Sequence, residues 1–262
     1  MKANVNGIGV YYETHGTTGP WLTLSHSLAC STAMWAPQIA EFSRNYRVLS
    51  FDTRGHGQTD APDGNYTLEQ LADDLAGLLR HLGIAQTHFC GLSMGGMIGQ
   101  TFALKYPGVF LSLTLADTTS RYPADAAGVW ADRITLAKAQ GMKPLVEPTL
   151  ARWFTEGFRA ARPDIMKTIG AQIAATPVAG YAGCCAALPK INATARLKEI
   201  TCPVLVIVGE QDMGTPLAMA EEIHANAPGS KLSVLSPAAH LSNLEQPEAF
   251  SAALAAFLKT AA

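Results

Sequence analysis

The stretch Gly91-Leu92-Ser93-Met94-Gly95 has the pattern G-x-S-x-G, whose meaning depends on the segments beside it. It follows an expected strand, Thr87–Cys90, and opens a helical stretch, Met94–Tyr106. A tight strand-to-helix turn in this place lifts a serine oxygen clear of the backbone, and glycines keep the turn free of crowding Cβ atoms. The competing interpretation is a plain turn between two elements. We predict that Ser93 is a catalytic nucleophile.

Around this turn, short runs rich in Val, Ile, Leu and Thr alternate with longer helical patterns. This alternation predicts an α/β fold, with a mostly parallel sheet flanked by helices. The strongest runs are apolar on both faces, as strands in a covered parallel sheet must be. The expected strands are Trp21–Ser25, Arg47–Phe51, Thr87–Cys90, Leu111–Ala116, Pro203–Val208 and Lys231–Leu235.

Two helices besides the one after Ser93 are well marked. Tyr66–Leu82 carries leucines on one stripe, and we expect Asp73, Asp74 and Arg80 to face outward. Gly83 is suited to end that helix as a C-cap. The chain closes with an expected helix at Pro247–Lys259.

The stretch from about Ser120 to Leu188 breaks the alternation, because its helical patterns are cut by Pro and Gly and it has no convincing apolar strand. We interpret residues 120–190 as a helical cap inserted in the core. Residues 1–119 and 191–262 then form one core domain.

A serine nucleophile requires a histidine to take its proton and a carboxylate to hold that histidine. His240 follows the last expected strand and is the predicted base, although a solvated loop histidine is the alternative. Asp212 lies in the loop after Pro203–Val208 and is the preferred acid. Asp117, at the end of Leu111–Ala116, is the competing acid.

The attacked carbonyl oxygen gains negative charge, which preset backbone N–H groups stabilise. The N–H of Met94 directly follows the nucleophile. The loop after Trp21–Ser25 should supply a second donor, and we expect the N–H of Leu28 to fill this oxyanion-hole role.

Composition and charge limit the kinds of partner that we expect the protein to bind. The 262 residues are 48% apolar and 15% charged with a formal charge of −2, so the chain lacks the basic field that holds nucleic acid. We expect a cytoplasmic protein with no membrane partner, since no apolar stretch resembles a signal or a span. Five cysteines without C-x-x-C spacing predict neither a disulfide framework nor a zinc site. Oligomeric state stays open.

Several of these motifs together resemble the α/β-hydrolase family over essentially the whole chain. They are the loop at His26, the stretch Asp52-Thr53-Arg54-Gly55-His56-Gly57, the Ser93 turn, the Asp212 loop and the segment His240–Pro247. The resemblance implies the α/β-hydrolase fold with its inserted helical cap.

More specific segments look like 3-oxoadipate enol-lactonases: Leu24–Leu28, Arg152-Trp153-Phe154-Thr155 and Gly180–Leu188, which includes the pair Cys184-Cys185. That resemblance implies hydrolysis of a small anionic enol-lactone in bacterial aromatic catabolism (the β-ketoadipate pathway), without a metal or organic cofactor. The substrate carboxylate needs a cation, and guanidinium suits it. From the cap arginines (Arg121, Arg133, Arg152, Arg159 and Arg162) we choose Arg133, together with Trp153, as substrate-binding residues.

Other functions fit the same motifs. Within the fold, the alternatives are a general carboxylesterase or lactonase, a cofactor-free perhydrolase and a carbon–carbon bond hydrolase. A ligand receptor that keeps the fold but turns over little is an alternative from another class.

Overall fold

The fold is built on an eight-stranded sheet with the order β1-β2-β4-β3-β5-β6-β7-β8. The computed structural model describes residues 1–123 and 126–261. β1 pairs with β2, and β2 with β4, in antiparallel fashion, whereas all pairs from β4 to β8 are parallel. The strands are β1 (Lys2–Val5), β2 (Ile8–His15), β3 (Trp21–Ser25), β4 (Arg47–Phe51), β5 (Thr87–Leu92), β6 (Phe110–Ala116), β7 (Val204–Gly209) and β8 (Lys231–Leu235).

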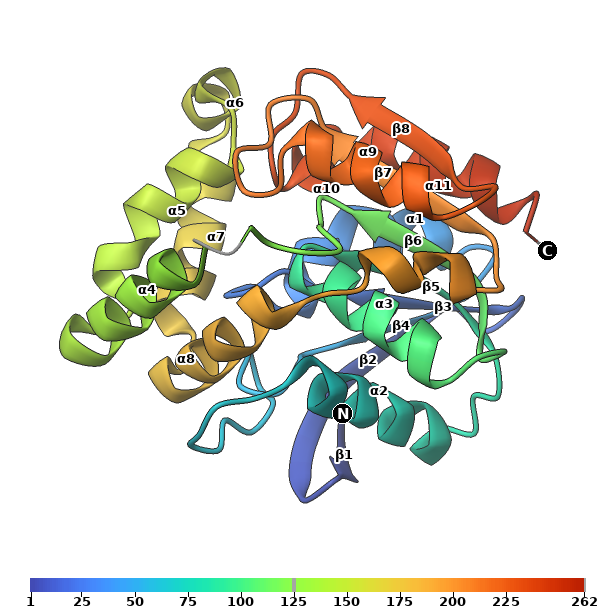
Figure 1. Ribbon diagram of the computed structural model, residues 1–262, viewed down its shortest axis with the longest axis horizontal. Coiled ribbons are helices and arrows are strands. Elements are labelled where there is room, and N and C mark those ends of the chain that lie inside the picture. Colours follow the sequence, from blue (N-terminus) through green and yellow to red (C-terminus); the bar gives the residue numbers. More distant parts are fainter. Residues whose placement is uncertain (124–125, 262) are drawn as a thin grey trace.

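Helices cover both faces of this sheet, with α2 and α3 in front of it and α1 behind it (Figure 1). α2 packs on α3, and α1 packs on α11. The core helices are α1 (Ala36–Phe42), α2 (Leu68–His81), α3 (Met94–Lys105), α9 (Leu217–Asn226), α10 (Ser242–Glu245) and α11 (Pro247–Leu258). Short 3-10 helices lie at η1 (Thr32–Trp35), η2 (Lys143–Leu145), η3 (Leu188–Lys190) and η4 (Thr194–Glu199).

All six expected strands are present, with bounds that shift by up to two residues. The central ones are buried along their whole length, as their two-sided apolar pattern predicts. β8 differs because it lies at the sheet edge and is mostly accessible. The sequence interpretation missed β1 and β2, which are antiparallel and half-buried. In β2, buried residues alternate with partly exposed ones, so a period of two marks this strand rather than a continuous apolar run.

The helix expected at Tyr66–Leu82 forms as α2, and Gly83 follows it with φ +66°, the left-handed conformation that suits a C-cap glycine. The prediction that Asp74 faces outward is wrong. Asp74 is 4% exposed and accepts two hydrogen bonds from the guanidinium of Arg54, at 2.6 and 2.9 Å. A buried charge needs such a partner, and here the partner comes from the loop after β4.

A helical region is inserted between β6 and β7, and it lies to one side of the sheet (Figure 1). It comprises α4 (Ala126–Gln140), α5 (Val146–Trp153), α6 (Glu156–Ala161), α7 (Pro163–Ala175) and α8 (Val178–Ala187). These helices lie within residues 120–190, the segment that we interpret as a cap. Residues 124 and 125 of that predicted segment, and residue 262 of the predicted core, lie outside the described residues.

The cap touches the core through α8. Gly180 approaches the backbone of Gly55 so closely that a Cβ on either glycine would collide with the other residue. Nearby, the Cys184 thiol donates to the carbonyl oxygen of Arg54, at 3.8 Å, and Cys185 is fully buried. All five cysteines have free thiols in the structure. The cysteine pair therefore serves as packing where cap and core meet.

Within the described ranges, no single helix combines the length and apolar character needed to cross a bilayer, although the bent pair Pro163–Ala175 and Val178–Lys190 meets that test jointly.

Candidate active site

Ser93 lies between β5 and α3, in a turn with a strained backbone. Its φ is 56°, in the left-handed region that side chains rarely adopt. The neighbouring glycines permit this turn, because a Cβ on Gly91 would meet the carbonyl of Gly95, and one on Gly95 would meet the carbonyl of Ser25. The turn holds the serine hydroxyl at the carboxyl edge of the sheet.

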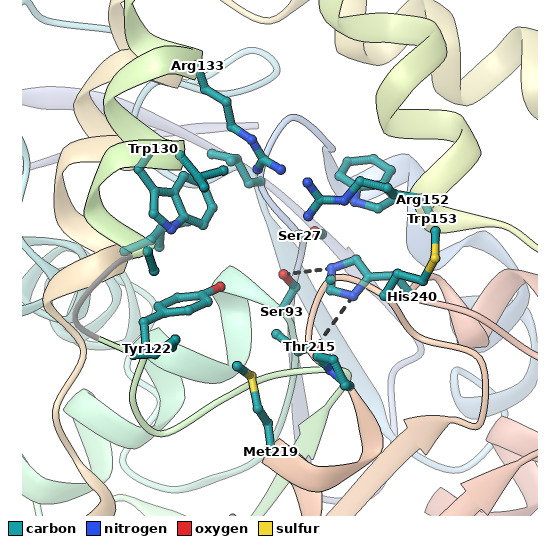
Figure 2. Close-up of a pocket in the computed structure, with 18 residues that line it drawn as sticks. Ser27, Ser93, Tyr122, Trp130, Arg133, Arg152, Trp153, Thr215, Met219 and His240 are labelled. Carbon is teal, nitrogen blue, oxygen red and sulfur yellow. Dashed lines mark hydrogen bonds between the residues drawn. The ribbon is translucent and has the colours of Figure 1, made fainter.

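Three predicted residues from distant parts of the chain meet at this edge. The Nε2 atom of His240 lies 2.9 Å from the Oγ atom of Ser93. On the other side of the ring, Nδ1 lies 2.8 Å from Oδ2 of Asp212. This geometry lets His240 accept the serine proton while Asp212 fixes the ring and its tautomer. Figure 2 shows the imidazole turned toward Ser93.

Asp212 sits in a loop that satisfies both carboxylate oxygens. Oδ1 accepts hydrogen bonds from the N–H groups of Gly214 and Thr215, at 2.6 and 3.0 Å, and Oδ2 accepts one from the Thr215 hydroxyl, at 2.8 Å. Burial acts to raise the pKa of Asp212, but His240 and Thr215 outweigh it and hold that pKa below the usual value. The acid therefore stays ionised at neutral pH.

The competing acid, Asp117, lies elsewhere. Its Oδ1 accepts a hydrogen bond from the N–H of Gly209, at 2.8 Å, and its Oδ2 bonds the hydroxyl of Ser242. Burial and the nearby charge of Asp212 raise the pKa of Asp117 well above the usual value. Asp117 thus ties the end of β7 to the loop after His240 and has no hydrogen bond to the imidazole among the described residues.

The loop that carries His240 is held by the cap as well as the core. The N–H of Leu241 donates to the carbonyl of Trp153, at 3.1 Å. Glu245 accepts from the N–H of Ala239 on one oxygen and from the N–H and hydroxyl of Thr155 on the other. Hydrogen bonds therefore tie the histidine loop to the segment after α5.

The two expected oxyanion donors lie beside the nucleophile. Met94 is the first residue of α3, so its N–H has no partner within the helix. Leu28 lines the same cavity as Ser93. Neither N–H has an acceptor within residues 1–123 and 126–261. Both donors are free to bind a substrate oxygen.

The site opens into a cavity of about 300 Å³ between core and cap. Ser93, His240 and Leu28 line it from the core side, together with residues 213–216 and Met219, and the cap lines the other side. Its cap-side residues are Tyr122, Pro123, Ala126, Val129, Trp130, Arg133, Arg152, Trp153 and Leu188. A volume of this size suits a small molecule.

Both residues that we expect to bind substrate line this cavity. The ring of Trp153 lies 6.0 Å from that of His240. The guanidinium of Arg133 lies 4.8 Å above the ring of Trp130, and Figure 2 shows it turned toward that of Arg152. Neither arginine has a carboxylate within ion-pair distance in the part of the chain that the structure describes. Two neighbouring cations without an acid favour an anionic ligand.

Sequence reasoning missed three residues of the site. Thr215 holds Asp212, Trp130 supports Arg133, and Tyr122 points its hydroxyl into the cavity. Trp130 lies three residues before Arg133 on α4, so helical spacing could have found it. Nothing in the local sequence marks Tyr122 or Thr215. The described residues contain no cluster of three His, Cys, Asp or Glu side chains that could hold a metal ion.

A family model and sequence relatives both match this chain over most of its length. The model of the alpha/beta hydrolase fold family matches residues 20–247. The chain is 39% identical to 3-oxoadipate enol-lactonase 2 of Acinetobacter baylyi over 253 residues, which cover 96% of this chain and 94% of that protein.

Solved structures agree with the sequence matches. The enol-lactonase of Burkholderia xenovorans superposes with a TM-score of 0.95 at 36% identity, covering 99% of this chain and 100% of that one. A thermophilic esterase of Thermogutta terrifontis, with malate bound, gives a TM-score of 0.94 at 30% identity, with 100% and 98% covered. The chain therefore belongs to the α/β-hydrolase fold family and is a hydrolase related to enol-lactonases.

Proposed function

We propose that this protein opens a small anionic enol-lactone, 3-oxoadipate enol-lactone, to give 3-oxoadipate through a serine acyl-enzyme. One observation carries the proposal: the hydrogen-bonded set of Ser93, His240 and Asp212 faces a cavity of about 300 Å³ that also holds two arginines without acidic partners among the described residues. Relatives named as enol-lactonases support this substrate class.

Acylation begins at Ser93. Its Oγ attacks the lactone carbonyl carbon while Nε2 of His240 takes the hydroxyl proton. The N–H groups of Met94 and Leu28 stabilise the oxyanion, each worth about 3 kcal/mol. The ring C–O bond then breaks, and the enol oxygen leaves with the proton that His240 returns. The enol becomes the ketone of the acyl-enzyme.

Deacylation uses the same residues. A water molecule loses a proton to His240, attacks the acyl carbon and displaces Ser93, which regains its proton from the imidazolium. The negative charge of Asp212 stabilises that imidazolium in both steps. The proposed cycle needs no metal ion or organic cofactor, since every proton transfer has a side chain to carry it.

The substrate carboxylate is proposed to bind at Arg133. Trp130 holds that guanidinium from one side, and Trp153 closes the cavity beside His240. Arg152 faces Arg133, so a carboxylate there reduces the repulsion between two like charges (Figure 2). This arrangement selects an anion and places its reactive carbonyl over Ser93.

A carboxylesterase of short esters is the second candidate. It is favoured by the likeness to the Thermogutta terrifontis esterase, whose structure holds malate, a small dicarboxylate. The two functions share Ser93 and His240 and differ in the size and charge of the acyl group. The ratio of kcat/KM for the enol-lactone to that for short neutral esters separates them.

Arg133→Ala tests the proposal. We expect kcat/KM for the anionic enol-lactone to fall at least about tenfold, mainly through KM, because a charge-assisted hydrogen bond is lost. A neutral aryl ester should lose much less. The control is Arg162→Ala, a cap arginine that is exposed and paired with Asp164. Equal losses on both substrates would remove Arg133 from carboxylate binding, and turnover of esters alone would favour the carboxylesterase.

A further inference from the structure

Tyr122 is a cavity residue with no part in the mechanism above. It follows the loop that begins at Asp117, and it lines the cavity with Ser93 and His240. Figure 2 shows its hydroxyl turned toward Ser93 from the side opposite the imidazole of His240. A substrate held over Ser93 therefore lies between the phenol and the imidazole.

The backbone at Tyr122 is anchored by its neighbour. Arg121 pairs with Asn192 in an antiparallel bridge, and its guanidinium binds Glu222 of α9, with Nε 2.8 Å from Oε1. The tyrosine ring itself contacts Trp130 edge to face, with centroids 5.8 Å apart and planes at 70°. The contacts of Arg121 fix the backbone next to Tyr122, and Trp130 supports the ring, so the hydroxyl is positioned before a ligand arrives.

The hydroxyl of Tyr122 is free to donate a hydrogen bond to a ligand. It has no partner within the part of the chain that the structure covers. The hydroxyls of Tyr12 and Tyr46 also lack one there, but of these three residues only Tyr122 lines the cavity that holds Ser93 and His240. Burial raises the pKa of Tyr122, more strongly than the positive charge of Arg133 lowers it. The phenol therefore stays protonated and is able to donate its hydrogen.

We propose that Tyr122 is a further catalytic residue, whose phenol donates a hydrogen bond to the leaving oxygen of the substrate as the carbonyl C–O bond breaks. The phenol keeps its own proton, and the proton that the leaving oxygen gains is the one that passes from Ser93 through His240. The hydrogen bond strengthens as negative charge builds on that oxygen, so it stabilises the transition state more than the bound substrate. This inference rests on the proposed ester or lactone hydrolysis but not on the identity of the lactone.

The test is Tyr122→Phe, measured on a series of aryl acetates whose leaving phenols differ in pKa. A hydrogen bond to a charged group is worth about 1.5 to 3 kcal/mol, which corresponds to about a 10- to 100-fold change in rate. We expect kcat/KM for phenyl acetate to fall at least about tenfold. For 4-nitrophenyl acetate, whose leaving oxygen is less basic, the loss should be much smaller. The slope of log kcat/KM against leaving-group pKa should therefore be steeper in the variant.

Tyr46→Phe is the matched control. Its phenol is also half-buried with a pKa raised by burial, but it contacts His88 and Phe42 away from the catalytic cavity. This control should keep the wild-type slope. Equal losses across the series in Tyr122→Phe, or no loss, would overturn the proposal while leaving enol-lactone hydrolysis intact. Failure of the unmodified protein to turn over any ester or lactone would overturn both proposals together.

Discussion

Replacing Asp212 with asparagine is the sharpest perturbation of the proposed mechanism, because the hydrogen bonds around it fix which way the amide must lie. Oδ1 receives two backbone N–H groups, from Gly214 and Thr215. The amide oxygen must take that place, since an NH₂ group there would face two donors. The NH₂ group of the asparagine then faces Nδ1 of His240.

A donor at this position reverses the tautomer of the imidazole. Nδ1 must accept, so the ring proton moves to Nε2, and Nε2 can no longer take the proton of Ser93, 2.9 Å away. The variant also lacks the carboxylate that stabilises the imidazolium. We expect kcat to fall by about 10³- to 10⁴-fold, as for triads in which the acid becomes an amide. At about 1.36 kcal/mol per tenfold, this is ~4 to 5.5 kcal/mol of barrier.

The assay is steady-state hydrolysis of the enol-lactone and an aryl ester, with the fold checked by circular dichroism. Asp117→Asn is the matched control. Asp117 accepts hydrogen bonds from Gly209 and Ser242 and has none to the imidazole among the described residues, so its charge is not needed to fix the tautomer of His240. We expect the control to keep most of its turnover. A loss below about tenfold in Asp212→Asn, or a larger loss in Asp117→Asn, would refute this reasoning.

Two further predictions concern stability. Burial lowers the pKa of His26 to about 4, and burial and the charge of His26 lower that of His56 to about 3, whereas the unfolded chain binds these protons near pH 6.5. The contribution of these two neutral histidines to stability is therefore full above about pH 6.5 and is lost as the pH falls from about 6.5 toward 3. Urea unfolding at pH 5 should have a lower midpoint than at pH 7, and His56→Gln should reduce this difference. Asp74→Asn leaves the guanidinium of Arg54 buried without its counterion and should lower the free energy of unfolding by about 3 to 5 kcal/mol. Asp73→Asn, at a half-exposed pair, should have much less effect, and similar urea midpoints for these two variants would contradict the argument.

The central strands of the sheet could be predicted from local sequence patterns. The strands β3 to β7 are short segments rich in apolar and β-branched residues between turns, and Ser93 lies where one such segment meets a helix. His240 and Asp212 could be placed near it because loops after parallel strands gather at one edge of the sheet. The strands β1 and β2 were not predicted from the sequence, because half-buried antiparallel strands have fewer consecutive apolar residues.

What could not be predicted depends on contacts between distant segments. By its position in the sequence, Asp74 is expected on the surface of α2. It is buried because Arg54, from the loop after β4, binds its carboxylate. Similarly, no local pattern shows which of the five arginines of the predicted cap face the cavity. Only the packing of α4 against α8 and of α5 beside the core places both Arg133 and Arg152 in its lining. Tyr122 lies in a loop, where no periodicity indicates the direction of a side chain.

In the proposed mechanism, Ser93 carries the acyl group during hydrolysis of the enol-lactone. The most direct measurement is titration with a serine-reactive phosphonate, following lactone hydrolysis and locating the label by peptide mass spectrometry. We predict that one equivalent labels Ser93 and that hydrolysis of the lactone disappears in proportion to labelling. Hydrolysis that persists after Ser93 is fully labelled, or a label that removes activity from another residue, would contradict the account.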